Sequence, residues 1–276
     1  MYNNTMTPKQ RINHITKWIK TYAKTAKASA LVVGISGGID SSVVSALCAR
    51  TGIKTIVVQM PIRQNKTLNN RSSMQAGWLL NRYPETVTHM SMDLTPVFSA
   101  FEKKIGPFVH YDDDTYETWQ LASANSRARL RMMTLYHIAQ CNSGLVVGTG
   151  NRVEDFGVGF FTKYGDGGVV ISSIGDCLKT QVWDMGRELG LEQEIIDATP
   201  TDGLWDDGRT DEGQLGMTYP ELEHAMDLHN DDNCIYNPLT LTKTEKAQLK
   251  KYREIRARNL HKMQPIPVCK MPKSVL

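Results

Sequence analysis

The segment that decides the fold is a turn rich in glycine and serine, Gly34-Ile35-Ser36-Gly37-Gly38-Ile39-Asp40-Ser41-Ser42. The apolar run Ala30–Val33 precedes it and predicts a buried strand of a parallel sheet. The stretch Ser41–Arg50 that follows predicts a helix, which Gly52 would end. A strand, a tight turn and a helix N-terminus form an anion cradle, because glycines leave backbone N–H groups accessible and the helix dipole adds positive charge.

The side chains of this turn suit a phosphate group that is accompanied by a cation. Ser36, Ser41 and Ser42 offer hydroxyl donors, and Asp40 would place a carboxylate beside the phosphates. That carboxylate is useful if Mg²⁺ lies between, since Mg²⁺ commonly takes one or two carboxylates plus phosphate oxygens. The spacing matches neither Gly-x-Gly-x-x-Gly nor the P-loop, which disfavours a dinucleotide redox site and a kinase-like cradle. A glycine-rich turn that binds nothing is the alternative.

Strands and helices alternate around this turn through the first 150 residues. The first helix is expected to begin after Thr7, which with Gln10 three residues later matches a capping box. Further helices are predicted near 69–82, 96–104 and 116–140, and further strands near 55–60, 87–91 and 145–149. The alternation favours an α/β fold with a doubly wound parallel sheet and flanking helices.

The composition of the chain changes after Thr149, because glycine is frequent from there to Gly175. The segment Thr199–Gly216 is polar, acidic and interrupted by glycines, and a loop this long in a compact enzyme is more often a lid or a binding loop than a linker. The segment Lys243–Lys262 carries many basic residues on a helical pattern, either a solvated helix face or a binding surface. No repeat or clear linker is present, so residues 1–276 are predicted to form one domain.

Composition excludes several classes of protein. The 276 residues are 41% hydrophobic and 22% charged, as in globular proteins. A net charge of +3 is too small to argue for a nucleic-acid partner, and no stretch approaches the ~20 apolar residues of a membrane span. Five scattered cysteines without a Cys-x-x-Cys pair predict reduced thiols in a cytoplasmic protein, with Cys48 in the core and Cys177 as a packing residue.

The turn resembles the PP-loop of the N-type ATP pyrophosphatases, which cleave ATP between the α- and β-phosphates and adenylylate a carbonyl or carboxylate oxygen. Later motifs resemble the signature of NAD synthetases, namely Asn125–Met132, Gly148–Glu154, Gly159–Gly168 (GFFTKYGDGG), Pro200–Leu204 and His261-Lys262. The resemblance runs from roughly residue 10 to residue 268. It implies an α/β fold of the adenine nucleotide alpha hydrolase type, which is Rossmann-like.

The resemblance also implies roles for individual residues. ATP would contact Gly34, Ile35, Ser36, Gly37, Gly38, Ile39, Asp40, Ser41, Ser42, Thr149, Lys179 and Thr201. The anionic dinucleotide would contact Arg129, Lys163, Asp166, His261 and Lys262. Asp40 and Glu154 would hold Mg²⁺, and the catalytic group would comprise Asp40, Asp166 and Lys179, with Asp166 as the candidate that deprotonates ammonium.

The implied reaction is the ATP-dependent amidation of nicotinic acid adenine dinucleotide (deamido-NAD) to NAD through an adenylylated intermediate, with release of AMP and pyrophosphate. The expected small-molecule partners are deamido-NAD, ATP and ammonia, with Mg²⁺ as cofactor, and the family implies a homodimer. At 276 residues the chain leaves no room for a nitrilase-like glutamine amidohydrolase domain, so free ammonia is the expected nitrogen source. The segments Arg63–Asn70 and Thr199–Gly216 are predicted to be loops that close and exclude water.

Two departures from the family pattern leave questions open. One residue more than usual lies between Thr149 and the Gly-Phe-Phe triplet, so Asp155 competes with Glu154 as the metal carboxylate. Val170 stands where the family often has an aspartate, so one polar contact to the dinucleotide is absent or comes from another residue, such as Asp166. The competing functions are another PP-loop amide-forming ligase and a non-catalytic nucleotide-binding paralogue.

Overall fold

The computed structural model describes residues 6–64, 66–109, 115–201, 203, 209–230 and 241–272. A five-stranded sheet with the order β3-β2-β1-β4-β5 forms its centre, and every strand pair is parallel. The strands are β1 (Ala30–Gly34), β2 (Lys54–Gln59), β3 (Val87–Ser91), β4 (Gly144–Gly148) and β5 (Ile171–Ser172). The predicted doubly wound parallel sheet is therefore confirmed.

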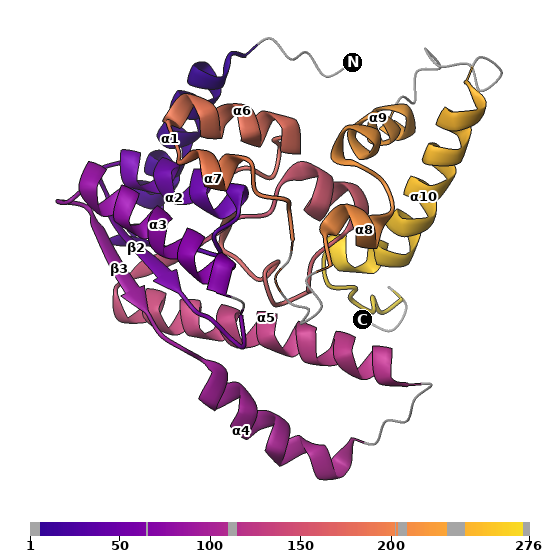
Figure 1. Cartoon of the computed structure of the whole chain (residues 1–276), viewed down its shortest axis with the longest axis horizontal. Coiled ribbons are helices and arrows are strands. Elements are labelled where there is room, and N and C mark those ends of the chain that lie inside the picture. Colours follow the sequence, from indigo (N-terminus) through magenta and orange to yellow (C-terminus); the bar gives the residue numbers. More distant parts are fainter. Residues whose placement is uncertain are drawn as a thin grey trace.

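Helices cover both faces of the sheet (Figure 1). One face packs against α1 (Pro8–Thr25), α2 (Ile39–Arg50), α3 (Lys66–Arg82) and α6 (Lys179–Leu189), and the other against α4 (Thr95–Ile105) and α5 (Tyr116–Cys141). Side chains alternate along a strand, so in β1 Leu31 and Val33 enter the first core and Ala30 and Val32 the second. Burial on both sides explains why β1 reads as one apolar run.

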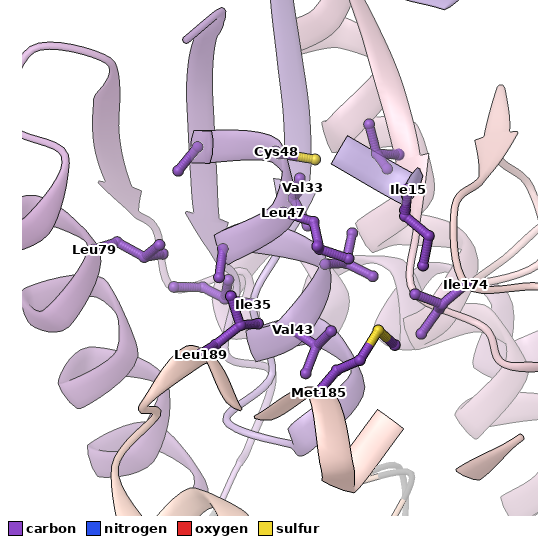
Figure 2. Close-up of a cluster of buried hydrophobic side chains, with 14 of the residues drawn as sticks. Ile15, Val33, Ile35, Val43, Leu47, Cys48, Leu79, Ile174, Met185 and Leu189 are labelled. Atoms are coloured by element: carbon purple, nitrogen blue, oxygen red, sulfur yellow. The ribbon is translucent and has the colours of Figure 1, made fainter. Parts of the chain in front are cut away.

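The first core fixes the positions of α2 and α6 against β1. Figure 2 shows Val33 of β1, Val43 and Leu47 of α2, and Met185 of α6 packed together in it. Cys48 lies in this core with no exposed surface, and Cys177 is buried, as predicted for both. Because α2 and α6 share this core, the residues at their N-termini are held at fixed positions relative to one another.

The structure confirms the predicted start of α1 and corrects the predicted start of α3. The capping box at the start of α1 is confirmed, since Thr7 accepts from the backbone of Gln10 and the Gln10 side chain accepts from that of Thr7. The helix predicted near 69–82 is confirmed as α3, but it begins three residues earlier, so the prediction of a loop is wrong at Lys66–Leu68. That stretch contains no glycine or proline, and burial of Leu68 favours a helix that turns this side chain inward.

The chain after β4 builds a second group of helices, on the right in Figure 1. Its elements are η2 (Arg152–Val158), α8 (Asp211–Leu215), α9 (Tyr219–Asn230) and α10 (Lys243–Met263), whereas α7 (Gln193–Ile196) lies beside α2 and α6 and adds Ile195 and Ile196 to the first core. Parts of η2, α8, α9 and α10 share a small core of their own, which includes Val153, Tyr219 and Tyr252. The helix predicted over Lys243–Lys262 is confirmed as α10, and the segment Thr199–Gly216, of which 202 and 204–208 lie outside the described residues, contains α8.

Two further observations bear on the compositional predictions. Among the described helices, none combines the length and the apolar character needed to cross a membrane. The described cysteines, Cys48, Cys141, Cys177 and Cys269, are all free thiols.

Candidate active site

A cavity of about 260 Å³ opens at the carboxyl ends of β1 and β4. The chain leaves β1 toward β2 and β3 and then returns to place β4 on the other side of β1, so the loops after these two neighbouring strands diverge. Open α/β sheets bind ligands at this point. Gly34 and Gly148, the last residues of the two strands, both line the cavity.

The glycine-rich turn is shaped by its contact with α3. Gly37 has φ of 83°, and a Cβ there would lie 2.7 Å from the carbonyl oxygen of Leu68 and 2.9 Å from the nitrogen of Ser72. Only glycine satisfies both the backbone conformation and the close approach. The turn therefore packs closely against α3 on one side, and residues of the turn line the cavity.

The three serines of the turn divide into two kinds. Ser36 and Ser41 line the cavity, with the Oγ of Ser41 accepting from the backbone N–H of Ser36 at 3.2 Å. Ser42 does not line the cavity; both Ser41 and Ser42 are buried, and their hydroxyl groups donate to the carbonyl oxygen of Gly38 at 3.1 and 2.9 Å. These two hydroxyl groups stabilise the start of α2, and the prediction that Ser42 contacts the ligand stays a prediction.

A buried lysine joins two carboxylates that are far apart in the sequence. The Nζ of Lys179, at the start of α6, lies 2.5 Å from Asp40 Oδ2 on α2 and 2.8 Å from Glu154 Oε1 on η2. The Lys179 side chain is 3% exposed. Burial lowers the pKa of Lys179, but the two carboxylates outweigh burial and raise it above its ordinary value, so the side chain stays a cation.

The two carboxylates differ in their surroundings. Asp40 also accepts from Asn151 Nδ2 at 3.1 Å, and burial raises the pKa of Asp40 against the lowering effect of Lys179. Burial acts on Glu154 too, but Lys179 and the hydrogen bonds from Lys179 and Tyr219 together lower its pKa. Glu154 is therefore the more firmly ionised member of the pair.

Tyr219 is a member of the site that the sequence analysis missed. From the start of α9, its buried hydroxyl donates to Glu154 Oε1 at 2.5 Å and also lies 3.1 Å from Asp211 Oδ2. Burial raises the pKa of Tyr219, and the neighbouring Glu154 and Asp211 raise it further, so the hydroxyl stays a protonated donor. A tyrosine that begins a helix 65 residues from its partner carries no signal in the sequence.

Replacing Tyr219 by phenylalanine is expected to lower the free energy of unfolding by about 2 kcal/mol at pH 7, because hydrogen bonds to charged groups contribute roughly 1.5–3 kcal/mol. Tyr252→Phe is the matched control, since Tyr252 is buried in the same small core but donates to a neutral acceptor, the carbonyl oxygen of Gly157, at 3.2 Å. That change should cost about 1 kcal/mol. Denaturant unfolding of both variants measures the difference, and equal losses would contradict a charged acceptor.

Glu154, near which one residue more than usual was predicted, lies in a π-helix. Residues Arg152–Val158 form η2, whose wider turns hold more residues than an α-helical turn, and π-helical turns are frequent at functional sites. Asp155 lies with its carboxylate directly over Gly150, where a Cβ would overlap it. Burial raises the pKa of Asp155, and Asp166, Glu154 and Asp40 add to the rise. Glu154, rather than Asp155, is the carboxylate that shares a cation with Asp40.

The remaining candidates fall into two groups. Thr149, Asp166 and Thr201 line the same cavity as the turn. Arg129, Lys163 and His261 do not line it but lie together, since Arg129 Nε donates to the carbonyl oxygen of Lys163 at 3.4 Å and Lys163 Nζ donates to that of His261 at 2.7 Å.

The end of α10 therefore lies against the GFFTKYGDGG segment. Lys262 Nζ donates to the carbonyl oxygen of Phe161 at 2.8 Å, which joins the same two parts of the chain. Asp166 accepts at Oδ1 from the backbone N–H of Thr162 at 2.9 Å, within that segment. Val170, at the position where an aspartate was expected, is 39% exposed and donates its backbone N–H to Val146 in β4.

The carboxylates suit a divalent cation that binds together with a ligand. Asp40 and Glu154 approach one positive charge, that of Lys179, from two different elements. Within the described part of the chain, no group of three or more His, Cys, Asp or Glu side chains is arranged to hold a metal. Two carboxylates with the remaining oxygens supplied from outside the protein is the donor set that Mg²⁺ takes with phosphates.

Comparison with known proteins gives consistent matches over most of the chain. A family model described as NAD synthase matches residues 11–266. The NH(3)-dependent NAD(+) synthetase of Carboxydothermus hydrogenoformans is 38% identical over 218 residues, which are 79% of this chain and 84% of that protein. The corresponding protein of Methanosarcina acetivorans is 31% identical over 260 residues, 93% of this chain and 96% of the relative. Among solved structures, an NMN synthetase from Francisella tularensis superposes with a TM-score of 0.80 at 28% identity, covering 97% of this chain and 99% of that one.

Proposed function

The chain belongs to the NAD synthase family, and from this premise we propose that the cavity at the ends of β1 and β4 carries out the ATP-dependent amidation of deamido-NAD. The activity is NH3-dependent NAD synthesis, a ligase reaction. The observation that carries the site assignment is the Asp40–Lys179–Glu154 cluster beside a glycine-rich anion cradle. Family membership decides against the other PP-loop ligases.

ATP binds in this proposal with its triphosphate over the turn Gly34–Ser42. The backbone N–H groups of the turn and the N-terminus of α2 face the phosphates, and Ser36 and Ser41 supply hydroxyl groups. Thr149 and Thr201, which line the same cavity, complete the ATP site, and Lys179 neutralises negative charge. The nicotinate carboxylate attacks the α-phosphorus and pyrophosphate leaves, a transfer that depends on positioning and charge neutralisation rather than on a protein nucleophile.

Asp40 and Glu154 are the proposed ligands of Mg²⁺. Held there together with ATP, Mg²⁺ would supply charge neutralisation to the phosphates. The support is the donor set itself, because carboxylates from α2 and η2 lie beside one another at the cavity wall, where both also contact Lys179 Nζ. Tyr219 orients Glu154 and Asn151 orients Asp40, so both carboxylates keep their direction while the reaction proceeds.

The second step requires neutral ammonia near the mixed anhydride. Ammonia attacks the carbonyl carbon of the adenylylated nicotinate, the carbon–oxygen bond to AMP breaks, and the amide of NAD remains. Asp166 is the proposed acceptor of the proton that ammonium gives up, supported by its position in the cavity wall. The basic group of Arg129, Lys163, His261 and Lys262 is the proposed holder of the dinucleotide phosphates.

The proposal extends to assembly and location. A homodimer is supported by apolar side chains that α4 and α5 leave exposed, among them Val97, Phe101, Leu121 and Met133. A cytoplasmic location is supported by the free thiols of the described cysteines, since oxidising compartments favour disulfides.

The nitrogen source tests the proposed function directly. The purified chain with ATP, Mg²⁺ and deamido-NAD is expected to release pyrophosphate and form NAD with ammonium, and to form none above the blank with glutamine that has been freed of ammonium. Addition of a separate glutaminase should restore NAD formation from glutamine. Efficient use of ammonium-free glutamine by the chain alone would contradict an ammonia-dependent enzyme, and absence of pyrophosphate release with ammonium would contradict the proposed reaction.

A second substrate is favoured by one comparison. The superposed structure from Francisella tularensis is named as an NMN synthetase, and it matches nearly the full length of this chain. Nicotinic acid mononucleotide presents the same carboxylate as deamido-NAD but lacks its adenylyl half. The assay above, run with each substrate at a series of concentrations, separates the two by their kcat/KM values.

A further inference from the structure

The cavity has a surplus of negative side chains that a triphosphate would have to overcome. Its described lining contains five carboxylates, Asp40, Glu154, Asp155, Asp166 and Asp211, and three basic side chains, Arg71, Arg131 and Lys179. A triphosphate placed among these groups is repelled unless basic side chains are available to it. Binding of a triphosphate here therefore needs a basic side chain that is not already paired with a group of the protein.

Two of the three basic side chains are engaged within the protein. Lys179 is paired with Asp40 and Glu154 at 2.5 and 2.8 Å. Arg131 on α5 donates from Nε to the carbonyl oxygen of Met60 at 3.0 Å, which fixes its side chain against the end of β2. Both cations therefore have part of their charge or hydrogen-bonding capacity satisfied.

Arg71 differs from both in that the described residues supply no hydrogen bond and no ion pair to any part of its guanidinium group. Its Nε is fully buried and has no hydrogen-bond partner among the described residues, and no described carboxylate forms an ion pair with its guanidinium group. Burying a guanidinium nitrogen without a partner costs free energy, so such a group is seldom kept without a ligand to satisfy it. Arg71 lies in none of the sequence motifs quoted above.

The position of Arg71 relates it to the turn. It lies on the face of α3 that carries Leu68 one turn earlier, and both side chains line the cavity. A Cβ placed on Gly37 would lie 3.0 Å from the Cβ of Arg71, so the arginine side chain starts immediately beside the glycine-rich turn. The proposed dinucleotide group is at the end of α10, and Figure 1 shows α3 and α10 on opposite sides of the molecule.

We propose that Arg71 binds the pyrophosphate portion of ATP, the β- and γ-phosphates that leave in the first step. This assignment rests on the proposed function. The α-phosphate must face the nicotinate carboxylate on the α10 side, so the phosphates that leave lie toward α3 and Arg71. A guanidinium group can donate two parallel hydrogen bonds to phosphate oxygens, which suits it to hold a doubly charged leaving group.

The test compares three ligands that share parts of ATP. Binding of ATP, inorganic pyrophosphate and AMP is measured by titration calorimetry in magnesium-containing buffer, for wild type, Arg71→Met and Arg71→Lys. Arg71→Met is expected to weaken ATP and pyrophosphate binding by about 10- to 100-fold and to leave AMP binding within about twofold. Arg71→Lys should restore part of the loss, because the charge returns without the two-pronged geometry.

Arg82→Ala provides the matched control, because Arg82 is an exposed arginine at the other end of the same helix. It should bind all three ligands like wild type, and thermal melts verify that each variant is folded. Unchanged pyrophosphate binding by Arg71→Met would overturn the assignment. Equal loss of AMP and pyrophosphate binding would overturn it too, since Arg71 would then support the shape of the turn. Wild-type protein that binds none of the ligands would overturn the proposed function itself and the assignment with it.

Discussion

Replacing Asp40 by asparagine is expected to lower kcat for pyrophosphate release by roughly 10²- to 10³-fold, the range seen when one group that stabilises transition-state charge is removed. Asparagine keeps the shape of the side chain and can still accept from Asn151 through its amide oxygen. It lacks the charge that faces Lys179 at 2.5 Å and that would hold Mg²⁺. Steady-state assays over a range of Mg²⁺ concentrations measure the effect.

Asp176→Asn is the control for this change, because Asp176 pairs with Arg152 at the surface with its side chain 96% exposed. It should leave kcat unchanged, since exposed ion pairs contribute little. The fold of Asp40→Asn should remain stable, because Lys179 keeps Glu154 as a partner at 2.8 Å. A kcat near that of wild type at saturating Mg²⁺ would contradict the role assigned to Asp40.

Replacing Lys179 by methionine is expected to affect both turnover and folding. Methionine has a similar length but no charge, so Asp40 and Glu154 would face each other without a cation between them. Breaking a buried ion pair by removing one partner costs roughly 3–5 kcal/mol. The free energy of unfolding at pH 7 should fall by about 3 kcal/mol, and kcat by roughly 10²-fold or more.

Two further variants test whether the loss of stability comes from the buried charges. Lys250→Met removes a lysine that is 79% exposed and 4.0 Å from Glu254, and it should change stability by less than about 0.5 kcal/mol. In the triple variant Asp40→Asn, Glu154→Gln and Lys179→Met, no buried charge of the cluster is left unpaired, so much of the lost stability should return. Denaturant unfolding measures all of them, and a Lys179→Met protein as stable as wild type would contradict the buried ion pairs.

Local patterns predicted most of the sheet and its helices correctly. The apolar run Ala30–Val33, the glycine-rich turn and the helix after it depend on neighbours in sequence, so they can be read from the sequence alone. The capping box at Thr7 is equally local. The wrong prediction at Lys66–Leu68 arose because the burial of Leu68, a tertiary contact, decides the conformation there.

The candidate site was less accessible to local reasoning. Lys179 and Asp40 are 139 positions apart, and only the resemblance to a known family pointed to both. Tyr219 and Arg71 lie in no quoted motif, and their roles depend on what the fold leaves beside them: a carboxylate for Tyr219, and no described partner for Arg71. The choice between Glu154 and Asp155 required the π-helix, because its geometry decides which carboxylate meets Lys179.

The ion pairs of Lys179 join residues that the ribosome synthesises at different times. Asp40 is synthesised 139 residues before the lysine that neutralises it, and Tyr219 follows 40 residues after that lysine. At synthesis rates of about 5–20 residues per second, Asp40 waits on the order of ten seconds for its partner. During this interval β1, α2 and β2 can already pack while Asp40 lacks its cation, and Glu154 is added only 25 residues before Lys179. The Asp40–Lys179–Glu154 cluster therefore forms late, after most of the sheet that carries it has been synthesised.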